Sequence, residues 1–145
     1  MIRALHPIAG VTGMLMIAAF WTSTVAVETF GTKDAVLSVK TAILWGLLVL
    51  VPAMAITGIT GFRMAGGSTD PRIARKRRRM PFIALNGMLV LVPCAVFLQA
   101  HAAAGEFESA FVVVQIIELL AGAVNLALFG LNLRDGFALT RRAAA

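Results

Sequence analysis

The chain has 145 residues, of which 59% are hydrophobic and 14% are charged, and its mean hydropathy is +0.88. An average soluble domain is about 45–50% apolar and about 25% charged, so both values depart in the direction of a membrane protein. This hydrophobicity excludes intrinsic disorder, and so short a chain has too little interior to hide its aliphatic side chains from water. The net charge of +6 raises nucleic-acid binding as an alternative. The basic residues lie between apolar runs rather than along one polar face, which argues against that alternative.

Charged residues divide the chain into four long apolar stretches. The first three hold 24, 22 and 26 consecutive uncharged positions, and the fourth holds 25 positions whose only charge is Glu118. About 20 helical residues cross the hydrocarbon core, so we predict transmembrane helices at about 8–27, 35–61, 82–104 and 109–133. The first stretch also has features of a signal peptide, but it is longer than the usual apolar region of about 7–15 residues. We therefore expect a retained span.

The predicted fold is all-α, with residues 1–145 forming one transmembrane domain built as an antiparallel four-helix bundle. Two short connections force antiparallel neighbours, and the segment 62–81 is predicted to be a basic loop. Eleven Lys and Arg residues fall on the side of both termini and this loop, whereas only Lys33 and Lys40 fall on the other side. The positive-inside rule therefore predicts both termini in the cytoplasm, in a bacterial inner (plasma) membrane.

A basic cluster lies in the predicted loop, directly below the membrane surface. It contains Arg75, Lys76, Arg77, Arg78 and Arg79. Such a cluster attracts anionic lipid head groups, at about 1 kcal/mol per charge near the surface. We therefore expect it to fix the topology and to contact membrane lipids.

One face of the fourth predicted helix carries residues that are costly to place in a membrane. Gln115, Glu118, Asn125 and Asn132 follow the three- and four-residue spacing of a helical face. At 1.5 Å per residue, Glu118 lies about 14 Å from the outer end of this helix, near the middle of the bilayer. Burial favours the neutral form of a carboxyl group, so Glu118 is the candidate ligand or proton site, with Gln115, Asn125 and Asn86 of the third span as polar partners. Asn86 lies at a depth that suits a polar rung with the two asparagines.

The same residues also admit a purely structural interpretation. Glu118 would then be a protonated group that hydrogen-bonds Gln115, Asn125 or a backbone carbonyl freed by Pro52 or Pro93. Each of these prolines falls near mid-membrane, removes a helical hydrogen bond and should bend its helix. Interhelical hydrogen bonds average only about 0.6 kcal/mol in membranes, a modest reason to keep so costly a residue. Function and interhelical bonding both stay open.

The two histidines raise a redox alternative, because cofactors are often held in the core of a helical bundle. His6 begins the first predicted span and His101 ends the third, so they lie on opposite sides of the membrane, about 30 Å apart. One copy of the chain then cannot place both on one iron, and haem b would need one axial histidine or ligands from two copies. A quinone is the other ligand of this class. His101 is otherwise expected in an outer vestibule that leads toward Glu118.

Motifs of soluble enzymes do not occur in the sequence. It lacks a P-loop, an HExxH, a CxxC and a nucleophile elbow, and it has one cysteine, Cys94. Any enzymatic activity would then need an active site within the membrane, and the sequence favours a non-enzymatic role. We predict a membrane protein that binds or moves a small molecule or ion with proton linkage at Glu118. Two alternatives remain: a haem b or quinone redox module, and an accessory or assembly subunit of a larger membrane complex. Small residues in the first two helices are also compatible with a homo-oligomer.

Overall fold

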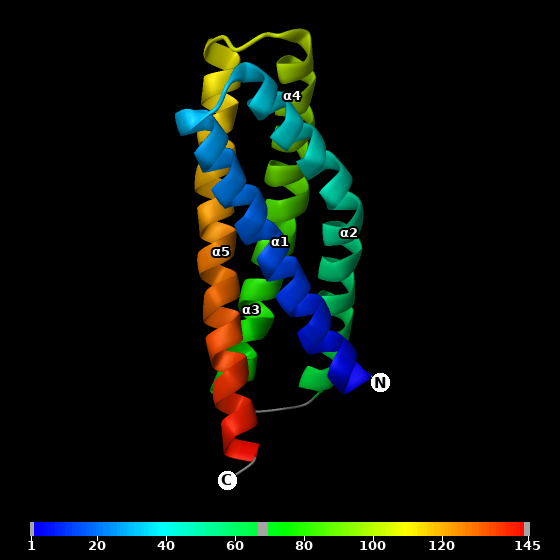
Figure 1. Cartoon of the computed structure of the whole chain (residues 1–145). Helices are drawn as coiled ribbons and strands as arrows, with labels where there is room; N and C mark the ends of the chain where they lie inside the picture. The colour runs from blue at the N-terminus through cyan, green and yellow to red at the C-terminus, as the bar shows by residue number, and fades with distance from the viewer. Residues whose placement is uncertain (1, 67–69, 144–145) are drawn as a thin grey trace.

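The computed structural model describes residues 2–66 and 70–143, which form helices and, over those residues, no strand (Figure 1). The elements are α1 (Ile2–Phe30), α2 (Lys33–Ala65), α3 (Pro71–Asn86), the short π-helical segment η1 (Gly87–Leu91), α4 (Val92–Ala104) and α5 (Ser109–Ala143). The elements α3, η1 and α4 follow one another without a break and form one long helical segment. Four segments are therefore long and apolar enough to cross a membrane, as a multi-pass membrane protein requires.

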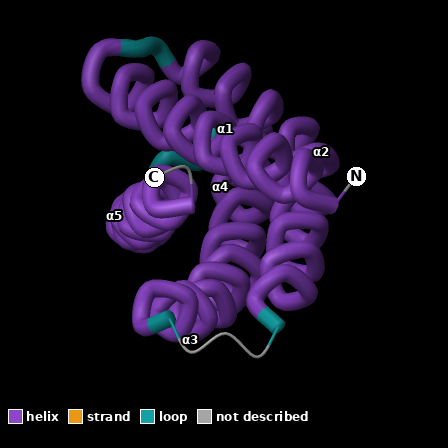
Figure 2. The backbone as a smooth tube through the Cα atoms, turned by 90° about the horizontal axis from the view of Figure 1, so that it is seen from below, coloured by secondary structure: helices purple, strands orange, loops and turns teal. Residues whose placement is uncertain are grey.

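Both ends of the chain lie at the same end of the molecule, which we call the terminal end (Figure 1). The α1–α2 and α4–α5 connections lie at the opposite end, which we call the loop end (Figure 1). Helix α1 packs most extensively against α2, and α5 packs against α1, α3 and α4. Seen from the terminal end, α3 stands apart from α1 (Figure 2), and among the described residues these two helices make no close backbone contact.

Local sequence signals set the helix ends. The side chain of Thr32 accepts a hydrogen bond from the Ala35 amide at 3.2 Å and so caps α2. Asp70 caps α3 by accepting from the Arg72 amide at 2.8 Å, and a proline follows at the first helical position. Gly105 ends α4 with φ = 74°, a conformation that glycine adopts without steric cost.

The bundle buries polar side chains and exposes apolar ones. Trp45, Leu48 and Leu89 are 66–69% exposed. The buried polar residues come from three of the four long segments: Thr24, Lys40, Thr57, Thr60, Gln115, Asn125, Asn132 and Asp135. Apolar side chains can face lipid without a free-energy penalty, whereas polar groups inside a bilayer must find hydrogen-bond partners within the protein. This distribution supports a membrane protein.

Two apolar clusters hold the helices together. The first takes one residue from each long segment, namely Ile17, Leu50, Ile83 and Phe129. The second lies toward the loop end and consists of Val36, Leu98, Ala102 and Phe111. We call the first one the apolar layer, because it reaches all four segments at one level of the bundle.

The predicted helix boundaries were too short, most of all around the basic segment. Helix α2 continues to Ala65 and α3 begins at Pro71, so most of the segment 62–81, predicted as a loop, is helical. The basic residues at 72–79 therefore lie on α3. Apolarity marks only the part of a helix that crosses hydrocarbon, whereas the helical hydrogen bonds continue to the next capping signal.

Candidate functional site

The central feature of the interior is an ion pair between α2 and α5. Lys40 Nζ lies 2.6 Å from Glu118 Oε2 and donates a hydrogen bond to it. The side chain of Lys40 is 0% exposed and that of Glu118 is 13% exposed. Counting the helical rise, Lys40 lies about 10 Å from the start of α2 and Glu118 about 14 Å from the start of α5. Each charge makes the burial of the other tolerable, because a lone buried charge is strongly unfavourable.

Gln115 extends this pair along α5. Its Nε2 donates a hydrogen bond to Glu118 Oε2 at 3.1 Å. Its Oε1 is buried and, among the described residues, has no hydrogen-bond partner. Buried acceptors in proteins are nearly always satisfied, and this oxygen is oriented so that it can accept a hydrogen bond from a small donor. We call these three side chains the Lys40–Glu118–Gln115 centre.

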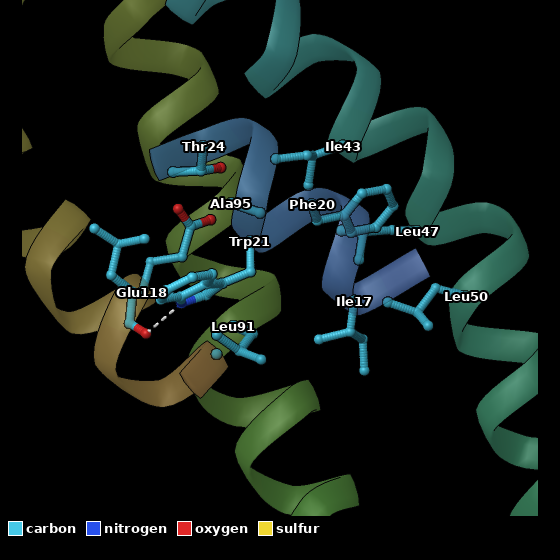
Figure 3. Close-up of a pocket in the computed structure, with 12 residues that line it drawn as sticks. Ile17, Phe20, Trp21, Thr24, Ile43, Leu47, Leu50, Leu91, Ala95 and Glu118 are labelled. Atoms are coloured by element: carbon cyan, nitrogen blue, oxygen red, sulfur yellow. Dashed lines mark hydrogen bonds between the residues drawn. The ribbon is translucent and has the colours of Figure 1, made fainter. Parts of the chain in front are cut away.

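A cavity of about 60 Å³ lies beside Glu118 (Figure 3). Its wall is mostly apolar, and the carboxyl group of Glu118 lies on the same side as the buried side chain of Thr24 (Figure 3). A cavity of this size holds a few water molecules. It is far smaller than the roughly 300 Å³ at which pockets for organic ligands begin. Water and protons therefore suit it better than an organic solute.

Trp21 ties α1 to α5 at the edge of this cavity. Its Nε1 donates a hydrogen bond to the Leu119 carbonyl at 2.9 Å (Figure 3). Glycine at position 122 makes room for the indole ring, since a Cβ there would lie 2.9 Å from Trp21 Cδ1. A small residue at this position allows the two helices to approach closely enough for the interhelical hydrogen bond.

A second polar layer joins α3 to α5. Asn86 Nδ2 donates to Asn125 Oδ1 at 2.8 Å and to the Ala121 carbonyl at 2.9 Å. Asn125 is 2% exposed, and its own Nδ2 lies 3.5 Å from the Ile83 carbonyl. The structure thus brings Asn86 and Asn125 together. Their hydrogen bonds go to each other and to backbone rather than to Glu118.

The two prolines differ in their effect on the helices. Pro93 follows η1 closely, and the Val92 amide bonds to the Gly87 carbonyl in the wide π pattern. A π turn accommodates the backbone donor that proline lacks. Helix α2 continues through Pro52. Glu118 bonds to neither freed carbonyl, because its hydrogen bonds go to the other members of the centre.

A third polar contact lies toward the terminal end. Arg79 Nη1 lies 2.9 Å from Asp135 Oδ2 and 3.4 Å from Asn132 Oδ1, and the Asp135 side chain is 6% exposed. Arg79 is among the residues expected to contact lipid, and in the structure its guanidinium faces these partners inside the bundle. Arg75 and Arg78 are exposed on α3. Their neighbours at 76 and 77 border a second cavity, described below.

The two histidines lie at opposite ends of the bundle, since His6 is near the start of α1 and His101 near the end of α4 (Figure 1). His6 Nδ1 is 2.9 Å from Thr60 Oγ1. His101 Nδ1 is 3.0 Å from the Phe97 carbonyl, and its ring stacks on that phenylalanine. Neither histidine lines the cavity beside Glu118. Over the described part of the chain, no three His, Cys, Asp or Glu residues are grouped as a metal site.

Sequence reasoning missed Lys40 and Asp135. Lys40 was counted as a flanking charge, but it shares the buried face of α2 with Val36 and Ile43, at the spacing of an inward helical stripe. That spacing was the signal that would have found it. Asp135 lies three residues after Asn132 on the polar face of α5, just beyond the predicted end of the helix at residue 133.

The chain matches no protein-family model, no curated protein and no solved structure. Its function is therefore inferred from the geometry and chemistry of the site.

Proposed function

We propose that the Lys40–Glu118 pair is a proton-exchange centre inside the membrane, and that the protein uses it to bind or move a small ion or molecule. One observation supports this proposal most directly. The side chain of Lys40 is fully buried and lies 2.6 Å from Glu118, which lines a cavity with room for water. Desolvation cancels most of what a buried ion pair contributes to stability. Ionisable residues within membrane spans typically mark proton and ion pathways, so exchange explains the two charges better than stability does.

The chemistry follows from the charge balance of the pair. A proton that reaches Glu118 Oε2 cancels the carboxylate charge and leaves Lys40 as a lone ammonium in apolar surroundings. That state costs several kcal/mol. It is relieved when Nζ releases a proton, or when the helices move to admit water or an anion. Proton arrival is thereby coupled to proton loss or rearrangement, while Gln115 orients the carboxylate through its hydrogen bond.

The apolar layer supports a two-state cycle. Ile17 and Leu50 line the cavity beside Glu118 and pack with Ile83 and Phe129. A solute or water chain that passes toward the terminal end requires this layer to open. The π turn at η1 lies in the third helical segment, a few residues after Ile83, and its last residue, Leu91, lines the cavity beside Glu118. Such π turns occur frequently at functional sites.

The proposal includes an orientation in the membrane. Successive spans run antiparallel, with both termini on the cytoplasmic side of a bacterial inner membrane. Eleven Lys and Arg residues belong to the cytoplasmic side in this arrangement. Because Lys40 is inside the bundle, only Lys33 remains on the other side, which strengthens the asymmetry. The exposed Arg75 and Arg78 then contact anionic lipid head groups.

Infrared titration of the protein reconstituted in membranes tests the proposal. We expect a carboxyl signal that responds to the pH of the medium and that is lost in Glu118→Gln. The charge-free double variant Lys40→Met/Glu118→Gln loses the same signal without leaving a lone charge, so it separates loss of the site from misfolding. Glu108→Gln removes an exposed carboxyl group at the loop end and serves as the matched control. A spectrum in which Glu118 never changes protonation would leave only a structural ion pair.

A further inference from the structure

A second, larger cavity opens at the terminal end of the molecule. Its volume is about 370 Å³, and α1, α2, α3 and α5 all contribute to its wall. This lies within the roughly 300–1,000 Å³ typical of small-molecule sites. It shares no lining residue with the cavity beside Glu118. The apolar layer separates the two, because its residues Ile17 and Leu50 line the smaller cavity and Phe129 lines the larger one.

Much of the wall is apolar and adaptable. Val11 and Met14 of α1 and Phe129 and Leu133 of α5 contribute to it. Methionine side chains adjust to irregular occupants. Gly58 of α2 also lines the cavity, and a Cβ added there would meet no atom within 4 Å. A hydrocarbon chain enters such a wall from the bilayer without leaving apolar surroundings.

Two adjacent cations from α3 border the same cavity. Lys76 is half-buried, and the guanidinium of Arg77 lies 5.6 Å from the centre of the Phe62 ring on α2. Asp135 interacts electrostatically with Lys76, but its direct ion pair is with Arg79, at 2.9 Å. Among the residues that the structure describes, no carboxylate lies within salt-bridge distance of Lys76 or Arg77. Two cations beside an apolar wall complement an anion that carries an apolar chain.

We propose that this cavity binds a single-chain amphiphilic carboxylate, a medium-chain fatty-acid anion taken from the surrounding membrane. Its carboxylate is held by charge-assisted hydrogen bonds from Lys76 and Arg77, and its chain lies along the apolar wall. The volume accommodates one chain rather than the two chains of a phospholipid. The site shares no residue with the Lys40–Glu118–Gln115 centre, so the two proposals stand or fall separately.

Native mass spectrometry tests this inference on protein released from phosphatidylcholine nanodiscs after addition of deuterated decanoate. We expect one decanoate per chain. In Lys76→Gln/Arg77→Gln, retention falls about tenfold because both charged partners of the carboxylate are lost. The alcohol 1-decanol has the same chain without the charge and is not retained.

Filling the cavity gives an independent arm of the experiment. Gly58→Leu places a side chain where no atom lies within 4 Å, so we expect loss of decanoate at an unchanged melting temperature. Gly130→Leu is the matched control, because that position on α5 also has no neighbour within 4 Å and lies outside the cavity. Undiminished decanoate binding by Gly58→Leu, equal retention of 1-decanol, or displacement by stoichiometric phosphatidylglycerol would overturn the proposal.

Discussion

The buried ion pair predicts an unusual pattern of stabilities. Replacing one partner leaves a lone charge in an apolar interior, whereas replacing both removes the uncompensated charge. We therefore compare Glu118→Gln, Lys40→Met and the double variant. Both single variants should be strongly destabilised, and the double variant should unfold with nearly the free energy of the wild type.

The size of each loss in stability follows from the distance between Lys40 Nζ and Glu118 Oε2 and from the ordinary pKa values of lysine and glutamic acid. At 2.6 Å the attraction is about 6 kcal/mol for an effective dielectric constant of about 20, and desolvation of the two ions offsets most of it. A lone charge is relieved by neutralisation. At pH 7 that step costs about 4.6 kcal/mol for an ordinary lysine and about 3.7 kcal/mol for an ordinary glutamic acid. Glu118→Gln should therefore cost about 4–5 kcal/mol, Lys40→Met about 3–4 kcal/mol, and the double change about 1 kcal/mol.

Unfolding by SDS in mixed micelles, followed by tryptophan fluorescence, measures these free energies. The pH dependence has opposite signs in the two single variants. In Glu118→Gln the unfolded state binds one proton more than the folded state, so stability rises with pH by about 1.4 kcal/mol per unit. In Lys40→Met the folded state binds the extra proton, so stability rises as the pH falls. The reasoning would be refuted if the loss of unfolding free energy in the double variant equalled the sum of the two single losses. It would also be refuted if the unfolding free energies of both single variants did not change with pH.

Three further predictions concern the other interhelical contacts. Asp135→Asn leaves Arg79 without its carboxylate and should cost about 1–3 kcal/mol in the same unfolding assay, and an unchanged midpoint would show that the pair is not coupled. Asn86→Leu removes two hydrogen bonds to α5 and should cost about 1 kcal/mol, since one interhelical bond in a membrane contributes about 0.6 kcal/mol on average. A much larger loss would mean that the π turn depends on this residue. Gly122→Ala pushes a Cβ against the indole of Trp21 and should cost about 1–3 kcal/mol and shift its emission, whereas a gain in stability would contradict the close packing.

The sequence predicted the number of helical segments because hydrocarbon thickness imposes a length that is visible as a run without charges. It did not predict where the helices end. Asp70 followed by Pro71 is a helix-start signal, but it lies within the segment 62–81, which is predicted from the sequence to be a basic loop. The third segment also contains a π turn, which no pattern of residues specifies apart from the nearby Pro93.

The polar face of α5 was visible in the sequence because every member repeats at helical spacing, and the structure buries Gln115, Asn125 and Asn132 on that face. The partner of Glu118 was not visible in the same way. A pairing between α2 and α5 depends on which helices are neighbours, and helical periodicity carries no such information. Lys40 was placed at the membrane surface because a lysine near a helix end normally extends toward water. Here its carboxylate partner lies inside the bundle, so the side chain is enclosed.

The bundle can be described as two units, α1 with α2 and α3 with α4 and α5, which meet mainly through α2 against α4 and α1 against α5. Helices α1 and α2 form the most extensive pair, and α3 is held to α5 by the Asn86–Asn125 and Arg79–Asp135 contacts. Across the two units, the Lys40–Glu118 pair supplies the charged link to α5. The larger cavity lies between the same units at the terminal end, where α1 and α3 stand apart (Figure 2). Neutralising Glu118 removes the charged link near one end of an interface that is already open at the other. Under the proposed function, one proton arriving at Glu118 therefore favours separation of the helices along this interface.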